Sequence, residues 1–184
     1  MTEVVGSVDQ VTVYPVKSLA GRTVPEAEVG PAGLVGDRAW SVVDATTGER
    51  VTVKGTPAMA EVVATGDDEA DTITLTEVLG RPVRLERTGE PQVDAAAVHL
   101  VSRSAIDRAA AGDVPAGCAA DDPRANLLLA LDGAHDERSW VGRGLRIGEV
   151  ELAVTRTPKH CLGVYAEVRT AGRVRPGDRV ELLG

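Results

Sequence analysis

The stretch LRIGEVELAVT, residues 145–155, decides the fold class of this chain. Two runs rich in Leu, Ile and Val flank a central Gly-Glu pair, which is the pattern of a β-hairpin. The segments VYAEV and DRVELLG follow, and the turn-rich sequence AGRVRPG separates them. We therefore expect the C-terminal part of the chain to consist of closing β-strands.

The N-terminal part shows the same β-rich pattern. Short β-branched runs recur between turn signals, and each predicts a strand: VTVYPV (11–16), WSVVD (40–44), RVTV (50–53) and TITLT (72–76). The acidic segment GDDEAD (66–71) predicts a charged hairpin loop between two of these strands. So many short strands favour a mainly β fold of the α+β class, a barrel or a sandwich with few short helices.

Three further segments organise the second half. TGEPQVD (88–94) predicts a connection between two parts of the chain, because Gly and Pro discourage regular structure. A helix is predicted from about Ser104 to Ala111, with Ser104 as its N-cap and Asp107 in the capping-box position. RANLLLAL (124–131) is a short buried strand or helix, because its periodicity fits both.

Composition limits the classes of partner. The 184 residues carry a formal net charge of −8, with a pI near 4.9. This acidity argues against binding nucleic acid or anionic membranes over a broad surface. The N-terminus MTEVVGSVDQ lacks the features of a targeting peptide, and no apolar run approaches membrane-spanning length. We expect a cytoplasmic protein.

The two cysteines are too few for a disulfide framework, and no closely spaced Cys/His cluster suggests structural zinc. Cys161 follows Arg156, Lys159 and His160, and nearby positive charge favours a thiolate, which is a nucleophile and a soft metal ligand. The alternative is a buried thiol that fills a core. Cys118 lies in PAGCAADD beside acidic residues, and no role is assigned to it.

Several other positions suit an anionic ligand. Lys17 and Ser18 end the segment YPVKS with a cation and a hydroxyl, and Arg38 follows the turn GLVGD. Arg124 and Asn126 add a guanidinium and an amide just before an apolar run. A solvated turn, or pairing of Arg38 with Asp37 or Asp44, explains the same residues without a ligand.

Taken in order, these segments resemble the MOSC family, named for the C-terminal domain of molybdenum cofactor sulfurases. The resemblance rests on the number and order of short motifs, which are YPVKSLAG, GLVGDRAW, RVTVKGTP, VHLVSRSAI, PRANLLLA, SWVGRGLRIGEVELAV, PKHC and GRVRPGDRVELLG. It covers nearly the whole chain. It implies an N-terminal β-barrel-like module at residues 1–90 fused to a MOSC-type β-barrel at 94–184.

The resemblance also implies a cofactor and a site. The family includes amidoxime-reducing components and bacterial reductases of N-hydroxylated compounds, which hold molybdopterin-bound molybdenum between two modules. The residues that match the family's pterin-binding positions are Lys17, Ser18, Arg38, Arg124 and Asn126. Cys161 matches the cysteine that ligates molybdenum, which would make it both the catalytic residue and the metal ligand.

This chain departs from the family pattern in three places. The family's RFRPN motif is reduced to DPRAN (122–126), and Ala95-Ala96 stand where some members have Thr-Ser. Relatives also have a substantial segment after the cysteine, whereas Leu162-Gly163-Val164 follow Cys161 directly. The shorter junction implies a wider pocket, altered substrate access or lost cofactor retention.

Three functions compete at this point. The first is a molybdenum-cofactor oxidoreductase that reduces N-hydroxylated small molecules with an external electron donor. The second is a sulfur carrier that holds a persulfide on Cys161, supplied by a separate pyridoxal phosphate-dependent cysteine desulfurase. The third is a non-catalytic carrier of the molybdenum cofactor.

Overall fold

The computed structural model describes residues 2–89, 96–114, 123–159 and 161–184. The chain divides into two compact units, the first comprising Met1–Thr12, Thr23–Val35 and Ala95–Gly184, and the second Val13–Arg22 and Gly36–Asp94. Each unit therefore combines segments that are distant in sequence. The module boundaries expected at 1–90 and 94–184 stay a prediction, and the compact units follow a different division.

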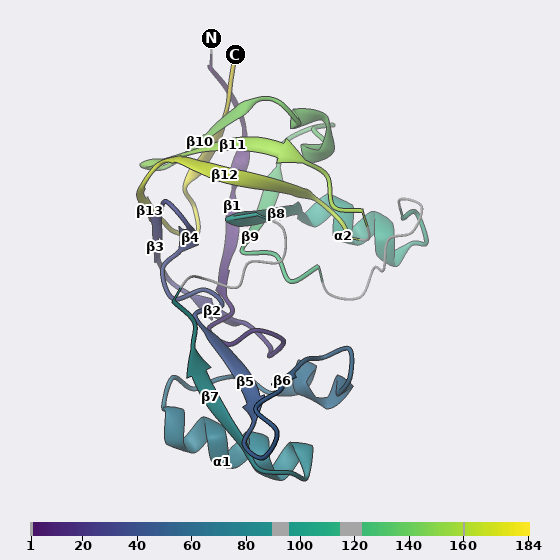
Figure 1. Cartoon of the computed structure of the whole chain (residues 1–184). Helices are drawn as coiled ribbons and strands as arrows, with labels where there is room; N and C mark the ends of the chain where they lie inside the picture. Colours follow the sequence, from purple (N-terminus) through teal and green to yellow (C-terminus); the bar gives the residue numbers. More distant parts are fainter. Residues whose placement is uncertain (1, 90–95, 115–122, 160) are drawn as a thin grey trace. The chain divides into compact units, whose positions relative to one another are not determined.

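A closed barrel of seven strands forms the first unit (Figure 1). Its strands are β14 (Arg179–Leu183), β10 (Gly144–Ile147), β11 (Val150–Arg156), β12 (Val164–Thr170), β8 (Val98–Ser102), β9 (Leu127–Leu131) and β1 (Thr2–Val13), in that order around the barrel. The pairing of β1 with β14 closes the ring. The mainly β fold and the barrel expected from the sequence are confirmed.

The barrel core follows from alternation along its strands. Leu145 and Ile147 on β10, Leu152 and Val154 on β11, and Val180 on β14 are all at most 2% exposed. Every neighbouring pair of barrel strands is antiparallel except β8 and β9, which are parallel. A parallel pair needs a crossover, and α2 (Arg103–Ala110) supplies it between β8 and β9.

Shorter elements complete the first unit. They are β2 (Arg22–Val24), which extends the sheet beyond β1, the small sheet β13 (Gly172–Val174), β3 (Ala27–Gly30) and β4 (Gly33–Leu34), and the 3₁₀ helix η2 (Glu137–Trp140). The hairpin predicted at 145–155 is confirmed as β10 and β11, and the ambiguous run at 124–131 forms the strand β9.

The second unit is a three-stranded antiparallel sheet with helices. Its elements are β6 (Arg50–Val51), β5 (Trp40–Asp44), β7 (Val83–Arg87), the 3₁₀ helix η1 (Pro57–Glu61) and α1 (Asp68–Leu79), and Figure 1 shows α1 beside β7. Val42, Met59 and Leu75 are each at most 1% exposed and belong to one apolar cluster that also includes Val16 and Leu19. This cluster packs the helices onto the sheet.

The sequence prediction for residues 66–76 is wrong. The expected hairpin loop and the expected strand TITLT are replaced by α1, whose N-cap Asp67 accepts hydrogen bonds from the backbone N–H groups of Glu69 and Ala70 at 3.0 Å. Acidic residues in the first turn stabilise the helix, because their negative charge interacts favourably with the positive end of the helix dipole. Gly80 ends the helix in the left-handed conformation. The burial of Leu75 outweighs the low helix propensity of the neighbouring β-branched residues.

The helix predicted at 104–111 exists, but its start is shifted. α2 spans Arg103–Ala110, and its N-cap is Ser102, whose hydroxyl accepts from the N–H of Ala105 at 3.1 Å. Ser104 lies within the helix, and its hydroxyl lies 3.1 Å from that of Ser102. Two serines that lie two positions apart can each act as an N-cap, which explains the error.

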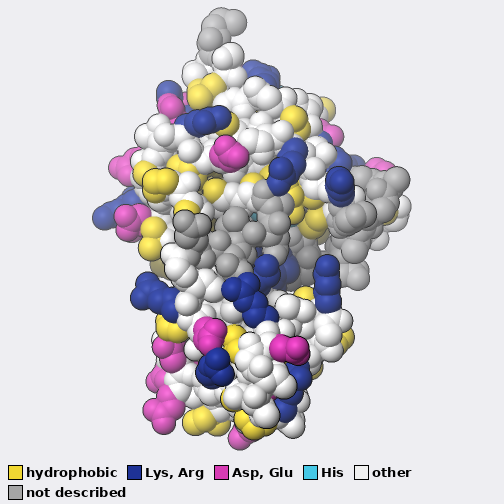
Figure 2. All heavy atoms as spheres, viewed as in Figure 1, with side chains coloured by type: hydrophobic (Ala, Val, Ile, Leu, Met, Phe, Trp, Pro, Cys, Tyr) yellow, Lys and Arg dark blue, Asp and Glu magenta, His cyan; other side chains and the backbone are white. Residues whose placement is uncertain are grey.

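The surface drawn in colour in Figure 2 carries basic and acidic side chains interspersed, with hydrophobic side chains scattered between them. Within the part of the chain that the structure describes, no helix is both long enough and apolar enough to cross a lipid bilayer.

Candidate functional site

Two backbone segments of the second unit hold Lys17, Ser18 and Arg38 close to one another. The N–H of Arg38 donates to the carbonyl of Tyr14 at 2.6 Å, and the N–H of Lys17 donates to the carbonyl of Trp40 at 2.8 Å. Val16 and Trp40 also form a parallel bridge. The three positions that the family resemblance assigns to one phosphate therefore lie in one group, which we call the phosphate cluster.

Backbone strain coincides with the predicted site residues. Among the described residues, only three that are not glycine have a positive φ: Ser18 (73°), Arg38 (49°) and Arg124 (48°). A side chain in this left-handed region costs roughly 1–2 kcal/mol per residue. Such strain persists where the surroundings impose it, and it gathers at binding and catalytic sites. All three are among the five predicted pterin-binding residues.

Arg38 is buried, at 6% exposure, and its contacts are specific. Its guanidinium pairs with the carboxylate of Asp37 and lies over the ring of Tyr14, with Cζ 4.9 Å from the ring centroid. Asp37 also accepts from the N–H of Tyr14 at 2.8 Å. The pairing with Asp37 considered from the sequence is therefore present, while Asp44 pairs with Arg81 instead, at 3.3 Å. Asp37 orients the guanidinium, which has five N–H donors in all.

A small hollow of about 110 Å³ adjoins the phosphate cluster on the Lys17 side. Its polar lining comes from Lys17, Ser41, Arg50 and Thr52. The volume equals that of roughly three to four water molecules, which is room for one tetrahedral oxyanion. Ser41 is 4% exposed, and its hydroxyl has no hydrogen-bond partner among the described residues. A buried hydroxyl in a hollow that two cationic side chains also line fits a phosphate oxygen.

Asn126 is 2% exposed, and its side-chain amide contacts backbone at both ends. Its Oδ1 accepts from the N–H of His99 at 3.1 Å, and its Nδ2 donates to the carbonyl of Thr12 at 3.4 Å. These bonds tie the entrance of β9 to β8 and β1. The geometry gives Asn126 a positioning role beside Arg124, and its contact with a pterin stays a prediction.

Cys161 lies half-buried against the segment that carries Arg124. Its thiol donates to the carbonyl of Pro123, with the sulfur 3.5 Å from the oxygen. The nearby cation Arg156 lies over the ring of Tyr165, with Cζ 5.7 Å from the centroid. His160, Cys118, Asp122 and Ala95 lie outside the described residues. Cys161 itself is intermediate in exposure, neither fully buried nor fully exposed.

The junction after Cys161 is a tight and well-fixed turn. Leu162 is 2% exposed and packs with Val101 and Ala105. Its carbonyl oxygen lies 2.8 Å from Nε2 of His99. Gly163 has φ +77°, and a Cβ at this position would lie 2.0 Å from the carbonyl oxygen of Leu100. Only glycine fits there, so the short junction holds Cys161 directly against the barrel.

The six predicted site residues therefore form two groups, one in each compact unit. Lys17, Ser18 and Arg38 belong to the second unit, and Arg124, Asn126 and Cys161 belong to the first. Within the described residues, no three His, Cys, Asp or Glu side chains are grouped so that they could hold a metal ion.

Sequence reasoning missed three residues of these groups. Ser41 and Arg50 line the hollow beside Lys17, and His99 fixes the carbonyl that follows Cys161. A small hydroxyl within the β-branched run WSVVD is a signal for Ser41, and a histidine within the apolar run VHLV is one for His99. Nothing in the sequence around Arg50 distinguishes it from a surface arginine.

Comparison with known proteins identifies relatives of this chain. Residues 5–119 match the family model described as "MOSC N-terminal beta barrel domain". A molybdenum cofactor sulfurase of Pyricularia oryzae is 34% identical over 79 residues, which is 41% of this chain and 9% of that protein. One of Botryotinia fuckeliana is 38% identical over 63 residues, 33% of this chain and 8% of that protein. The chain thus spans less than a tenth of these relatives' length.

Solved structures share the fold. The YUAD protein from Bacillus subtilis superposes with a TM-score of 0.56 at 14% identity, covering 99% of this chain and 96% of that one. A second structure, described as a hypothetical protein, gives a TM-score of 0.51 at 14% identity, covering 98% of this chain and 69% of the other.

Proposed function

Because the chain belongs to the MOSC family, we propose that it binds the molybdenum cofactor and reduces N-hydroxylated compounds. One observation supports this proposal above the others. The left-handed backbone of Ser18, Arg38 and Arg124 falls on three of the residues that the family pattern assigns to the pterin. Strain at these positions is explained if a ligand uses their geometry.

The phosphate cluster would hold the terminal phosphate of the pterin. Lys17 contributes a positive charge, Ser18 a hydroxyl, and Arg38 a guanidinium whose orientation is set by Asp37. The hydroxyl of Ser41, which has no partner in the part of the chain that the structure describes, offers a further donor. A local cationic group is required here, because the whole chain carries a net charge of −8 and repels anions at long range.

The family pattern assigns the remaining contacts to residues that belong to the first unit. Arg124 adds a third cation, and Asn126 keeps its segment in place through bonds to two strands. The thiolate of Cys161 would act as a protein ligand to molybdenum. The fixed turn at Leu162 and Gly163 limits the movement of this ligand.

When bound, the cofactor supplies two-electron redox chemistry at a metal that accepts oxygen ligands. Reduction of a hydroxylamine consumes two electrons and two protons and yields an amine and water. The electrons would come from a separate donor protein, and the substrate is a small molecule.

Metal and pterin analysis of wild-type protein beside Cys161→Ala tests this function. We expect molybdenum and pterin in the wild type, and turnover of a hydroxylamine with a chemical electron donor. Cys161→Ala should retain pterin and lose turnover. Wild-type protein from a cofactor-competent host that carries neither molybdenum nor pterin contradicts the proposal. Pterin binding without turnover under any electron donor supports a non-catalytic carrier instead.

A second candidate is a sulfur carrier. The curated relatives are named molybdenum cofactor sulfurases, and the thiol of Cys161 is half-exposed. In this function the thiolate attacks the outer sulfur of a desulfurase persulfide, takes that sulfur, and releases the desulfurase thiolate. Intact mass after incubation with a cysteine desulfurase and cysteine should then rise by one sulfur atom. An unchanged mass contradicts the sulfur-carrier function.

A further inference from the structure

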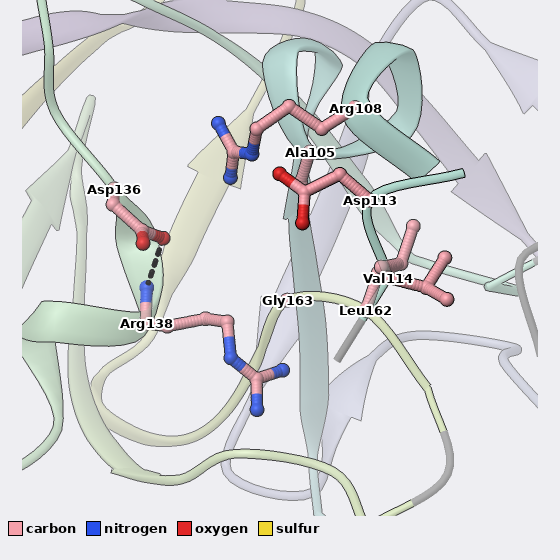
Figure 3. A pocket seen from close by; sticks show the side chains of 8 residues that line it. All are labelled: Ala105, Arg108, Asp113, Val114, Asp136, Arg138, Leu162 and Gly163. Atoms are coloured by element: carbon pink, nitrogen blue, oxygen red, sulfur yellow. Dashed lines mark hydrogen bonds between the residues drawn. The ribbon is translucent and has the colours of Figure 1, made fainter. Parts of the chain in front are cut away.

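A second hollow, of about 290 Å³, lies in the first unit beside the Cys161 turn. Figure 3 shows Arg108, Asp113, Asp136 and Arg138 around it. The apolar part of its wall includes Ala105 and Leu162, which are 4% and 2% exposed. None of these residues belongs to the predicted cofactor site.

The opposite charges around this hollow do not pair with one another. Among the described residues, the side chains of Arg108 and Asp113 form no hydrogen bond or ion pair. The carboxylate of Asp136 accepts from the backbone N–H of Arg138 at 3.0 Å, and the guanidinium of Arg138 donates to the carbonyl of Cys161 at 3.5 Å. Two guanidinium groups and two carboxylates therefore line one cavity, and among the described residues no ion pair joins them.

This charge arrangement selects against ligands of a single sign. A simple anion in the cavity meets two carboxylates, and a simple cation meets two guanidinium groups, so each gains little net attraction. A ligand with one positive and one negative group can pair with the carboxylates and with the guanidinium groups at the same time. The volume lies just below the usual range for small-molecule sites, which fits a compact metabolite.

We propose that this cavity binds a zwitterionic ligand of the free α-amino acid class. The carboxylate of the ligand contacts Arg108 and Arg138, and its ammonium group contacts Asp113 and Asp136. An apolar side chain packs on Ala105 and Leu162. Arg138 donates to the carbonyl of Cys161, and Leu162 follows Cys161 in the chain. A ligand in the cavity therefore stiffens the turn that carries the thiol. This binding needs no pterin and goes beyond the proposed reductase function.

Calorimetric titration with L-leucine tests the proposal, together with two analogues that each lack one charge. N-acetyl-L-leucine lacks the ammonium group, and L-leucinamide lacks the carboxylate. We expect L-leucine to bind and each analogue to bind roughly fivefold more weakly or worse, as for the loss of a partly exposed ion pair. No binding of L-leucine up to about 10 mM overturns the proposal. Binding of either analogue as tightly as L-leucine also overturns the proposal.

Charge-removing variants locate the site. Arg108 and Asp113 are exposed, so R108Q and D113N should fold like the wild type, which circular dichroism checks. Each should weaken L-leucine binding roughly two- to fivefold. The matched controls R169Q and E167Q remove exposed charges from β12 and should leave binding unchanged. Unchanged binding in both R108Q and D113N contradicts the assignment of this cavity.

Discussion

The phosphate cluster and the Cys161 turn hold functional side chains in opposite ways. In the phosphate cluster, Ser18 and Arg38 themselves adopt left-handed backbone. In the Cys161 turn, the positive φ lies on the neighbouring Gly163, where it carries no side-chain penalty. Strain therefore lies on residues that we propose bind the ligand in the phosphate cluster, and it is avoided in the Cys161 turn. Substitutions should affect ligand binding in the first region and folding in the second.

Gly163→Ala should have the largest effect on stability. The new Cβ would lie 2.0 Å from the carbonyl oxygen of Leu100, in a backbone conformation that disfavours any side chain. We expect the free energy of unfolding to fall by about 3–5 kcal/mol in urea denaturation. Gly177→Ala is the matched control, because its φ is +91° and nothing lies near the added Cβ, so it should cost about 1 kcal/mol. Equal losses in the two variants contradict the fixed turn.

Asn126→Ala should have the next largest effect. It leaves the N–H of His99 and the carbonyl of Thr12 without their side-chain partner in a buried setting. We expect a loss of about 2–3 kcal/mol in the free energy of unfolding. Gln10→Ala removes a half-buried amide from β1 and should cost under about 0.5 kcal/mol. If Asn126→Ala lowers pterin content at unchanged stability, Asn126 is a direct ligand and not a positioning residue.

Ser18→Gly should separate stability from binding. Glycine accepts the φ of +73° without steric cost. We expect the free energy of unfolding to rise by about 0.5 kcal/mol, because relief of strain exceeds the added chain entropy. Pterin content should fall in the same protein, because the hydroxyl is lost. A variant that is less stable and still fully loaded with pterin would show that the strain serves folding.

Asp44 should give the smallest effect, and this effect should fade in acid. It ends β5, and the N–H groups of Thr47 and then Thr46 hold its pKa below the ordinary value of 3.8. A lowered folded-state pKa stabilises the protein above the unfolded-state pKa, and this contribution is lost as the pH falls through the folded-state value. The difference in Tm between wild type and Asp44→Asn should therefore shrink from pH 6 to pH 3. A constant difference contradicts this assignment.

The sequence predicted the barrel better than it predicted the helices. Alternation in LRIGEVELAVT depends only on which side chains face the core, so β10 and β11 were predictable. Residues 72–76 are β-branched except for Leu75 and still form α1. The cap at Asp67 is local and was readable in the sequence, whereas the burial of Leu75 is decided by tertiary structure.

The candidate site was predictable in residue type but not in geometry. Lys17, Ser18 and Arg38 carry the right chemistry in the sequence, but the positive φ values of Ser18 and Arg38 appear only in three dimensions. The sequence offered both Asp37 and Asp44 as partners of Arg38, and the structure decides for Asp37. Ser41 and His99 were missed because their roles depend on burial and on contacts with distant segments.

The pterin content of Lys17→Ala beside wild type tests the central claim most directly. Lys17 adjoins the hollow that fits a phosphate, and its replacement removes a positive charge from the phosphate cluster. Arg84→Ala removes an exposed charge from β7 and serves as the control. We predict that wild type and Arg84→Ala carry equal amounts of pterin and molybdenum and that Lys17→Ala carries far less. Equal loading of all three proteins, at equal stability, would contradict the assignment of this cluster to the cofactor.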